Sequence, residues 1–293
     1  MLFSLVANGS LTTHDPHGSA VPWWSFTKTV LAGAALTLVR DGLITLDETL
    51  PEGPFTLRQL LKHEAGLADY SELADYHAAV ARDETPWSAN EMLQRLDAAT
   101  LRYTPGEGWR YSNVGYLFVA RLIERVSGQA LDAALATRVF SPMGLTRVRL
   151  ATRRADLVEV NIGAATTYDP RWVYHGLLVG PLDDAVLCLD RLLGGQLLPP
   201  SLLAQMQTAR VLGGPIAGRP WRAPGYGLGL MQSSVENGLT LSGHTGVGPG
   251  SVIAVYRCVE GDRSASCAVF CDRLSEGDVE SHVANQLRSA VAL

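Results

Sequence analysis

Four stretches rich in strand-forming residues follow one another near the end of the sequence, and they constrain the fold more than any other feature. They cover residues 226–231, 239–242, 251–256 and 265–270. Short turns such as Glu236-Asn237-Gly238 and Glu260-Gly261-Asp262 separate them. Strands joined by such turns run in opposite directions, because a parallel pair needs a longer crossover. The sequence therefore predicts an antiparallel sheet.

The beginning and the end of the chain are predicted to complete the same lobe. Residues 2–15 alternate as a β-hairpin does, with Asn8-Gly9 at the turn, and we expect this hairpin to join the sheet. Residues 279–291 have an amphipathic helical pattern and would cover one face of it. His14 and His17 flank a turn, and we interpret them as turn residues rather than metal ligands. We expect neither a metal nor another cofactor.

The middle of the chain is predicted to be mainly helical. Helical spacing recurs over residues 131–140, 182–193 and 201–209. Capping boxes at Thr56 and Ser88 start two further helices, the first of which would carry Leu60, Leu61 and His63. The predicted fold class is α/β of the α+β type, an antiparallel sheet flanked by N- and C-terminal helices plus an inserted helical lobe. We expect residues 1–50 and 206–293 to form the sheet lobe and residues 51–205 the helical lobe, with the active site between them.

Charge and composition exclude several functional classes. The 293 residues carry a net charge of -5, and Lys and Arg are not gathered into runs, so a nucleic acid is not an expected partner. No apolar run reaches the roughly 18–20 residues of a membrane helix, and no signal peptide is recognisable. The four cysteines form no C-x-x-C pair and are expected to be free buried thiols. We expect a cytoplasmic protein, or a periplasmic one if a leader was removed. The sequence does not indicate an oligomeric state.

A serine and a lysine stand at the start of one strongly apolar helical pattern. Ser25 and Lys28 precede it, and Asp41-Gly42 ends it. Side chains three residues apart on a helix share a face, at about 5–6 Å between Cβ atoms. The first turn also offers unpaired N–H groups and the positive end of the helix dipole. This combination suits a serine nucleophile, although Ser25 taken alone would more readily be interpreted as an N-cap.

Two further triplets follow in order along the chain. Tyr111-Ser112-Asn113 lies between an irregular loop and an apolar helix that ends at Ser127-Gly128. His244-Thr245-Gly246 lies on a predicted strand and is followed by Pro249-Gly250. Side chains at a loop-to-helix junction such as that of Tyr111 to Asn113 are held rigidly and remain reachable.

Together these triplets resemble the motifs of the penicillin-recognising serine hydrolases. That family includes class C β-lactamases, D-alanyl-D-alanine carboxypeptidases, esterases and D-aminopeptidases, with motifs S-x-x-K, Y-x-N and K-T-G or H-T-G. Residues 60–67, which read LLKHEAGL, are similar to the L-L-x-H-x-S-G-L stretch of the family, although Glu64-Ala65 departs from its usual small polar residues. The resemblance implies a β-lactamase/transpeptidase-like fold.

The resemblance also implies a role for each motif residue. Ser25 would be the nucleophile, and Lys28 and Tyr111 would share the role of base. Asn113 would hold Lys28 and a substrate amide. The substrate-binding and oxyanion residues would be Asn113, His244, Thr245, Gly246 and Val247, with the backbone N–H groups of Ser25 and Val247 forming the oxyanion hole. His244 could instead be a strand histidine bonded to the backbone.

The expected function is that of a serine hydrolase which acts on a small ester, amide or peptide through an acyl-enzyme. His244 replaces the lysine of dedicated β-lactamases, and a neutral imidazole favours less anionic substrates. The alternatives are a catalytically weak penicillin-binding-type sensor, a true β-lactamase or a D-alanyl-D-alanine carboxypeptidase. His63 is interpreted as structural. Whether the tryptophans Trp23, Trp24, Trp172 and Trp221 form core or shape an acyl pocket is left open by the sequence.

Overall fold

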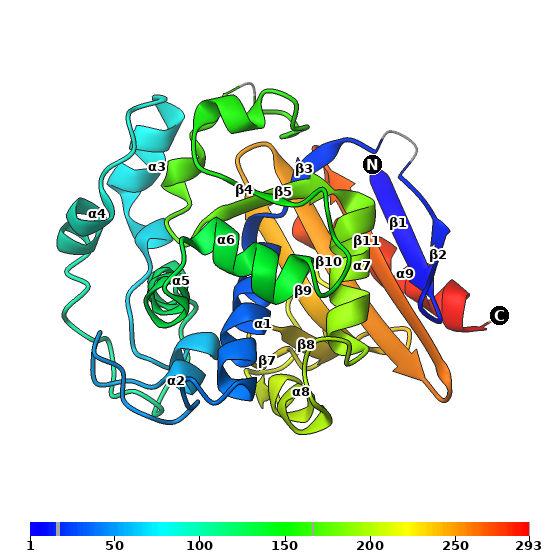
Figure 1. The fold of residues 1–293 in the computed structure, drawn as a ribbon. Coiled ribbons are helices and arrows are strands. Elements are labelled where there is room, and N and C mark those ends of the chain that lie inside the picture. The colour runs from blue at the N-terminus through cyan, green and yellow to red at the C-terminus, as the bar shows by residue number, and fades with distance from the viewer. Residues whose placement is uncertain (16–17, 166, 293) are drawn as a thin grey trace.

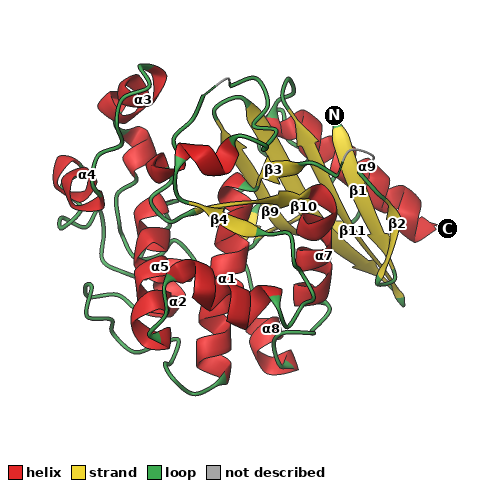
Figure 2. Ribbon diagram, turned by 45° about the horizontal axis from the view of Figure 1, so that its top comes forward, coloured by secondary structure: helices red, strands yellow, loops and turns green. Residues whose placement is uncertain are grey.

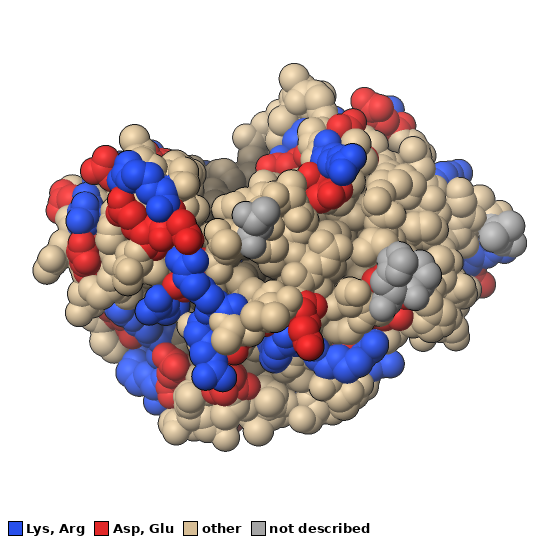
Figure 3. All heavy atoms as spheres, turned by 90° about the horizontal axis from the view of Figure 1, so that it is seen from above, with Lys and Arg blue, Asp and Glu red and all other residues tan. Residues whose placement is uncertain are grey.

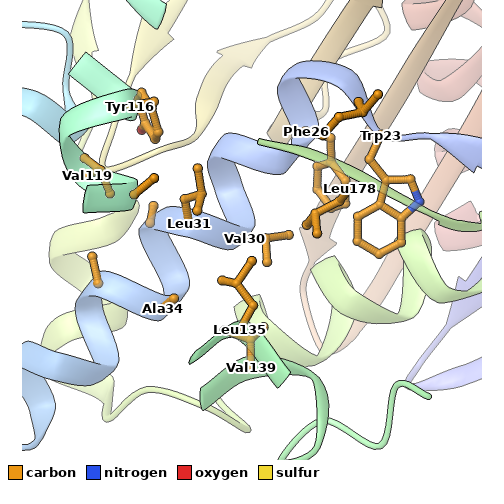
Figure 4. Packing of buried hydrophobic residues seen from close by; sticks show 14 of the residues in the cluster. Trp23, Phe26, Val30, Leu31, Ala34, Tyr116, Val119, Leu135, Val139 and Leu178 are labelled. Carbon is orange, nitrogen blue, oxygen red and sulfur yellow. The ribbon is translucent and has the colours of Figure 1, made fainter. Parts of the chain in front are cut away.

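One buried helix organises the core of the computed structural model, which describes residues 1–15, 18–165 and 167–292. This helix, α1 (Thr27–Arg40), is buried along all of residues 27–38. A helix that is largely apolar on every side belongs inside a protein, because no face of it is suited to water. Figure 4 shows Leu31 facing α5 (Asn113–Ser127) and Val30 facing Leu135. The predicted helix after Ser25 and its end at Asp41-Gly42 are confirmed.

The other elements surround α1 in two groups, one of helices and one that contains the main sheet (Figure 1). The helical group consists of α2 (Leu57–Leu61), η2 (Tyr70–Glu72), α3 (Ala74–Ala81), α4 (Ala89–Arg95), α5, α6 (Leu131–Leu135) and the π-helical turn η3 (Ala136–Phe140). Short 3-10 turns occur at η1 (Trp24–Phe26), η4 (Arg154–Leu157) and η5 (Pro170–Trp172). The later helices are α7 (Leu182–Leu193), α8 (Pro200–Met206) and α9 (Glu276–Ala292).

The main sheet is antiparallel throughout and has eight strands in the described ranges. Their order is β2-β1-β11-β10-β9-β8-β7-β6. The strands are β1 (Leu2–Ala7), β2 (Ser10–Thr13), β6 (Arg210–Val211), β7 (Gly225–Tyr226), β8 (Met231–Ser234), β9 (Thr240–Gly248), β10 (Ser251–Glu260) and β11 (Arg263–Cys271). The predicted hairpin is confirmed, and it joins the sheet because β1 pairs with β11. Both Asn8 and Gly9 have positive φ, as a two-residue hairpin turn requires.

Helices cover both faces of this sheet (Figure 2). Alternate residues of β10 point to opposite sides: Ile253 and Val255 join the large core around α1 and α7, whereas Val252 packs with α9. The predicted C-terminal helix and its cover of one face are therefore confirmed. The helix α7, which the predicted boundaries place with the helical lobe, packs on β1, β10 and β11. The predicted lobe boundaries stay a prediction.

A second, three-stranded sheet was not predicted. It consists of β3 (Ala20–Pro22), β5 (Leu177–Pro181) and β4 (Arg149–Ala151), in the order β3-β5-β4. All five residues of β5 are buried, so its sequence shows no alternation that would reveal a strand. The backbone N–H of Trp23 donates to the carbonyl of Leu178 at 2.9 Å. This small sheet therefore fixes the chain just before Ser25.

Several local predictions differ from the structure. The run 226–231 is broken after Tyr226, where the N–H of Gly227 donates to the carbonyl of Leu230 at 2.8 Å and closes a tight loop. The helix α2 ends at Leu61, and His63 follows it with φ of 59°. All four cysteines are free and buried, as predicted.

The structure bears on metal sites and membrane-spanning helices only within the residues that it describes. His14 contacts Asp183, and His17 lies outside the described residues. Within the described ranges no cluster of three or more His, Cys, Asp or Glu side chains could hold a metal ion. In the same ranges no helix has the length and apolarity needed to cross a membrane.

A nearly buried ion pair joins α7 to the sheet and gives a test of the fold. Asp190 on α7 accepts hydrogen bonds from Arg257 of β10 and, at 2.8 Å, from Ser266 of β11. We expect Asp190→Ala to lower the free energy of unfolding by roughly 3–5 kcal/mol, because Arg257 would remain buried without a counter-charge. Chemical denaturation measures this. Glu84→Ala, which removes the exposed pair with Arg82, should change stability by less than about 0.5 kcal/mol. Equal effects of the two substitutions would refute the role of the pair.

Candidate active site

Ser25 lies on a strained turn rather than on α1 itself. It belongs to η1, the 3-10 turn directly before the helix. The preceding residue, Trp24, has φ of 39°, which is rare and costly for a residue with a side chain. The surrounding structure holds it there: the Trp24 indole donates to Ser251 Oγ at 3.0 Å and packs edge-on against Tyr168. The position of Ser25 is thus set by contacts with the main sheet.

The structure brings three of the sequence-predicted side chains together. Lys28 Nζ lies 3.1 Å from Ser25 Oγ, one helical turn along the chain. The Tyr111 hydroxyl donates to the same Oγ at 3.0 Å from the segment that leads into α5. Ser25 is therefore contacted by an amine and a phenol at once.

Burial changes the acid–base properties of Lys28 and Tyr111 in opposite senses. Lys28 is fully buried, and desolvation lowers its pKa to about 7, against a smaller opposing effect of the Asp69 carboxylate. Desolvation raises the pKa of Tyr111 well above its usual value, and its hydrogen bond to Ser25 opposes this only partly. At neutral pH a large share of Lys28 is the free amine, whereas Tyr111 keeps its proton. The two groups expected to share the role of base therefore differ in protonation at neutral pH. The Lys28 amine is the better proton acceptor of the two.

A residue that sequence reasoning missed completes the surroundings of Lys28. His175 Nε2 lies 3.2 Å from Lys28 Nζ, and both side chains are buried. His175 stands alone before β5 and belongs to no motif, so no local signal marks it. Only the packing of β5 against η1 and α1 brings it to the site.

Asn113 differs from its expected role. Its backbone N–H and side-chain Nδ2 both donate to Asp69 Oδ1 at 3.0 Å. Among the described residues, the hydrogen bonds of Lys28 Nζ go to Ser25 and His175. The expectation that Asn113 holds Lys28 is therefore corrected, because the carboxylate of Asp69, another residue missed from the sequence, takes its donors. Asn113 still lines the cavity beside Ser25.

Two of the residues expected to contact substrate turn away from the cavity. His244 is buried behind Tyr111, where it accepts from the Tyr226 hydroxyl at 2.9 Å and donates to the carbonyl of Thr245 at 2.7 Å. Burial lowers the pKa of His244 to about 3, so the ring is neutral. Thr245 lies on the other side of the strand, bonded to Tyr256 and Glu280. His244 thus matches the alternative of a strand histidine bonded to the backbone.

The next two residues of β9 lie against Ser25. A Cβ on Gly246 would stand 2.6 Å from the Ser25 nitrogen, so only glycine permits this approach. Pairing between β8 and β9 ends at Gly243 in the described residues, and the Gly248–Ser251 pair closes the β9–β10 hairpin. By the alternation of an antiparallel ladder, the Val247 N–H then points away from β10. This geometry fits the expected oxyanion hole.

His63 supports the site from behind. Its Nδ1 accepts from the backbone N–H of Ser112 at 3.1 Å, and its ring lies 4.3 Å from that of Tyr111. Burial lowers its pKa well below the usual value, so it is neutral. This agrees with a structural role.

A cavity of about 390 Å³ opens beside Ser25, and its walls are largely aromatic and apolar. Trp24 is the tryptophan that lines it, whereas Trp23 and Trp172 are buried in the main core. None of the described residues that line it is Asp, Glu, Lys or Arg. The lining residues are Trp24, Ser25, Tyr70, Ser71, Tyr76, His77, Val80, Asn113, Tyr168, Val173, His175, Val247, Gly248 and Pro249. Figure 3 shows the molecule hollowed between the side of α3 and α4, which carries many charges, and the side of the sheet.

Comparisons with known proteins agree on one family. The family model described as Beta-lactamase matches residues 7–282. Lovastatin esterase of Penicillium rubens is 29% identical over 47% of this chain and 42% of its own length. Esterase EstB of Burkholderia gladioli is 26% identical over 73% of this chain and 66% of its own. A D-aminopeptidase of Brucella anthropi is 28% identical over 77% of this chain and 43% of its own length. The chain thus spans about two fifths to two thirds of the length of these relatives.

Solved structures share the fold. A D-stereospecific amidohydrolase from a Streptomyces species has a TM-score of 0.76 at 23% identity, covering 96% of this chain and 92% of that one. The D-amino acid amidase from Ochrobactrum anthropi SV3, in complex with L-phenylalanine amide, has a TM-score of 0.77 at 20% identity, covering 99% and 93%. The predicted β-lactamase/transpeptidase-like fold is confirmed.

The contact between Gly246 and Ser25 can be tested by adding one methyl group. We expect Gly246→Ala to slow the reaction of Ser25 with a fluorophosphonate probe by about 10²-fold or more, because β9 must move away from the Ser25 nitrogen. The labelling rate and the circular dichroism spectrum measure reactivity and folding. Gly214→Ala is the matched control, since a Cβ there meets nothing within 4 Å. An unchanged labelling rate in Gly246→Ala would show that the close approach is not needed.

Proposed function

This chain belongs to the Beta-lactamase family, and from that premise we propose that it is a serine hydrolase which cleaves a small ester, amide or peptide through an acyl-enzyme. One observation carries the proposal: a fully buried amine with a pKa of about 7 contacts the hydroxyl of Ser25. Such an amine accepts a proton at neutral pH, which an exposed lysine does not.

In the proposed acylation, the Lys28 amine takes the proton of Ser25 as Oγ attacks the substrate carbonyl. The negative charge that develops on the carbonyl oxygen is stabilised by the N–H groups of Ser25 and Val247. Tyr111 keeps its proton at neutral pH and gives it to the leaving group. The Lys28 ammonium then returns a proton to Tyr111, and water cleaves the acyl-enzyme with Lys28 again as base.

The cavity supports an uncharged acyl group as the substrate. No Lys or Arg side chain among the described lining residues could pair with the carboxylate of a β-lactam or D,D-peptide. The Asp69 carboxylate accepts from Asn113 and from Ser71, and it is not among the described residues that line the cavity beside Ser25. Aromatic walls from Trp24, Tyr70 and Tyr168 suit an apolar or aromatic acyl chain. A neutral ester or amide is therefore the favoured substrate class.

The nucleophile can be tested by covalent labelling. We expect a fluorophosphonate probe to label the wild-type protein and to leave Ser25→Ala unlabelled, because the probe reacts with an activated serine. Intact mass spectrometry measures labelling, and hydrolysis of p-nitrophenyl esters, D-amino-acid amides and nitrocefin ranks the substrates. Labelling without turnover of any substrate would support a sensor domain instead. Nitrocefin cleavage well above ester cleavage would overturn the preference for uncharged substrates.

The pH dependence of activity tests the assignment of the base. Because the pKa of Lys28 is lowered to about 7, the free amine increases as pH rises through 7. We expect kcat/KM for a neutral ester to rise about tenfold per unit below pH 7 and to be level from about pH 8 to 10. Asp69→Asn should shift this rise to lower pH, since the Asp69 carboxylate raises the pKa of Lys28. A rise centred near pH 10 would contradict the proposal.

A further inference from the structure

The nitrogen of Lys28 has few neighbours that can accept a hydrogen bond. The rings of Tyr111 and Tyr116 lie beside it, with centroids 5.0 and 5.7 Å away. Its hydrogen-bond partners in the described residues are Ser25 Oγ and His175 Nε2. Apart from Ser25 Oγ, the acceptor that Lys28 Nζ meets within the described ranges is thus an imidazole nitrogen.

The protonation state of His175 follows from these contacts. Burial and the nearby Lys28 lower the pKa of His175 well below its usual value, so the ring is neutral. An ammonium has hydrogens to donate and no lone pair, so Nε2 must accept when Lys28 is charged. The ring hydrogen then lies on Nδ1, which is buried and has no hydrogen-bond partner among the described residues. Within the described residues, the hydrogen bond to Lys28 is therefore the one that the His175 ring makes.

We propose that His175 is a positioning residue of the serine hydrolase reaction, which accepts a hydrogen bond from Lys28 through Nε2 and so directs the Lys28 lone pair at Ser25 Oγ. The inference rests on the proposed function. A neutral amine has two hydrogens and one lone pair, and its rotation about the last C–N bond decides which of them faces the serine. With one hydrogen held by His175, the lone pair is free to face the Ser25 hydroxyl.

The opposite arrangement would inhibit the enzyme. If the ring hydrogen were on Nε2, His175 would donate to the Lys28 lone pair and occupy the site that must receive the serine proton. The position of one hydrogen on His175 therefore decides whether Lys28 can act as a base. A histidine kept for packing alone has no such requirement, because its shape does not depend on that hydrogen.

Two substitutions separate positioning from packing. His175→Phe keeps a planar ring but loses the acceptor, and His175→Gln keeps an acceptor oxygen but has a different shape. We expect His175→Phe to lower kcat for a p-nitrophenyl ester by up to about 10²-fold with little change in KM, because the base is misdirected while the cavity remains. His175→Gln should keep most of the wild-type kcat. If packing alone mattered, His175→Phe would be the more active of the two, which would overturn the proposal.

Controls distinguish this inference from the function on which it rests. His282→Phe, on α9 across the main sheet from the core around α1, should leave kcat unchanged. A wild-type protein that no fluorophosphonate labels would refute the proposed function, whereas normal labelling with equal kcat in His175→Phe and wild type would refute only the inference. If His175→Phe does not fold, the ¹⁵N shifts of His175 in the wild-type protein decide: we expect Nδ1 to carry the hydrogen at pH 8, and a hydrogen on Nε2 would overturn the proposal.

Discussion

The burial of one amine is the constraint on which the rest of the structure depends. Lys28 lies near the start of α1, a helix enclosed by core on every side, and its nitrogen is removed from water. Desolvation of a cation is unfavourable, and the fold offers no carboxylate in contact with it among the described residues. The result is an amine with a pKa of about 7, of which a large share is uncharged at neutral pH. The core that stabilises the protein is therefore also what makes Lys28 a base.

A base is useful only if the nucleophile and the oxyanion donors are fixed relative to it. Three pieces of chain meet at Ser25: the small sheet through Trp23, the edge of β9 through Gly246, and the segment before α5 through Tyr111. Each is anchored away from the site, the last by the Ser112 N-cap and its hydrogen bond to His63. These contacts hold Trp24 in its left-handed conformation.

The sequence predicts the parts of this arrangement that depend on local signals. The hairpin at Asn8-Gly9, the helix α5 between Ser112 and Gly128, and the order of the three triplets each have a short-range physical cause. The strands β3, β4 and β5 do not, because each has only three to five residues, and β5 pairs with β3 across more than 150 positions and with β4 across about 30. Partners such as Asp69 and His175 are equally invisible, since only tertiary packing brings them to Asn113 and Lys28.

The directions in which the side chains of β9 point also could not be predicted from the sequence motif. A triplet motif names three adjacent residues, but a strand sends neighbours to opposite faces. His244 and Gly246 face the helical core and Ser25, whereas Thr245 faces α9 and its buried Glu280. Which residues face the site depends on the register with β10, and the triplet by itself does not reveal that register.

The electrostatics of the base and the chemistry of the cavity support the same substrate. A buried amine with a pKa of about 7 responds strongly to charge nearby, because little solvent screens it. A substrate carboxylate in the cavity would stabilise the ammonium form and remove free base at neutral pH. An uncharged acyl group has no such effect, and the described cavity lining provides aromatic surface and no Asp, Glu, Lys or Arg side chain for it. The neutral His244 behind Tyr111 fits this pattern, since a cation there would favour an anionic substrate and lower the pKa of Lys28 further.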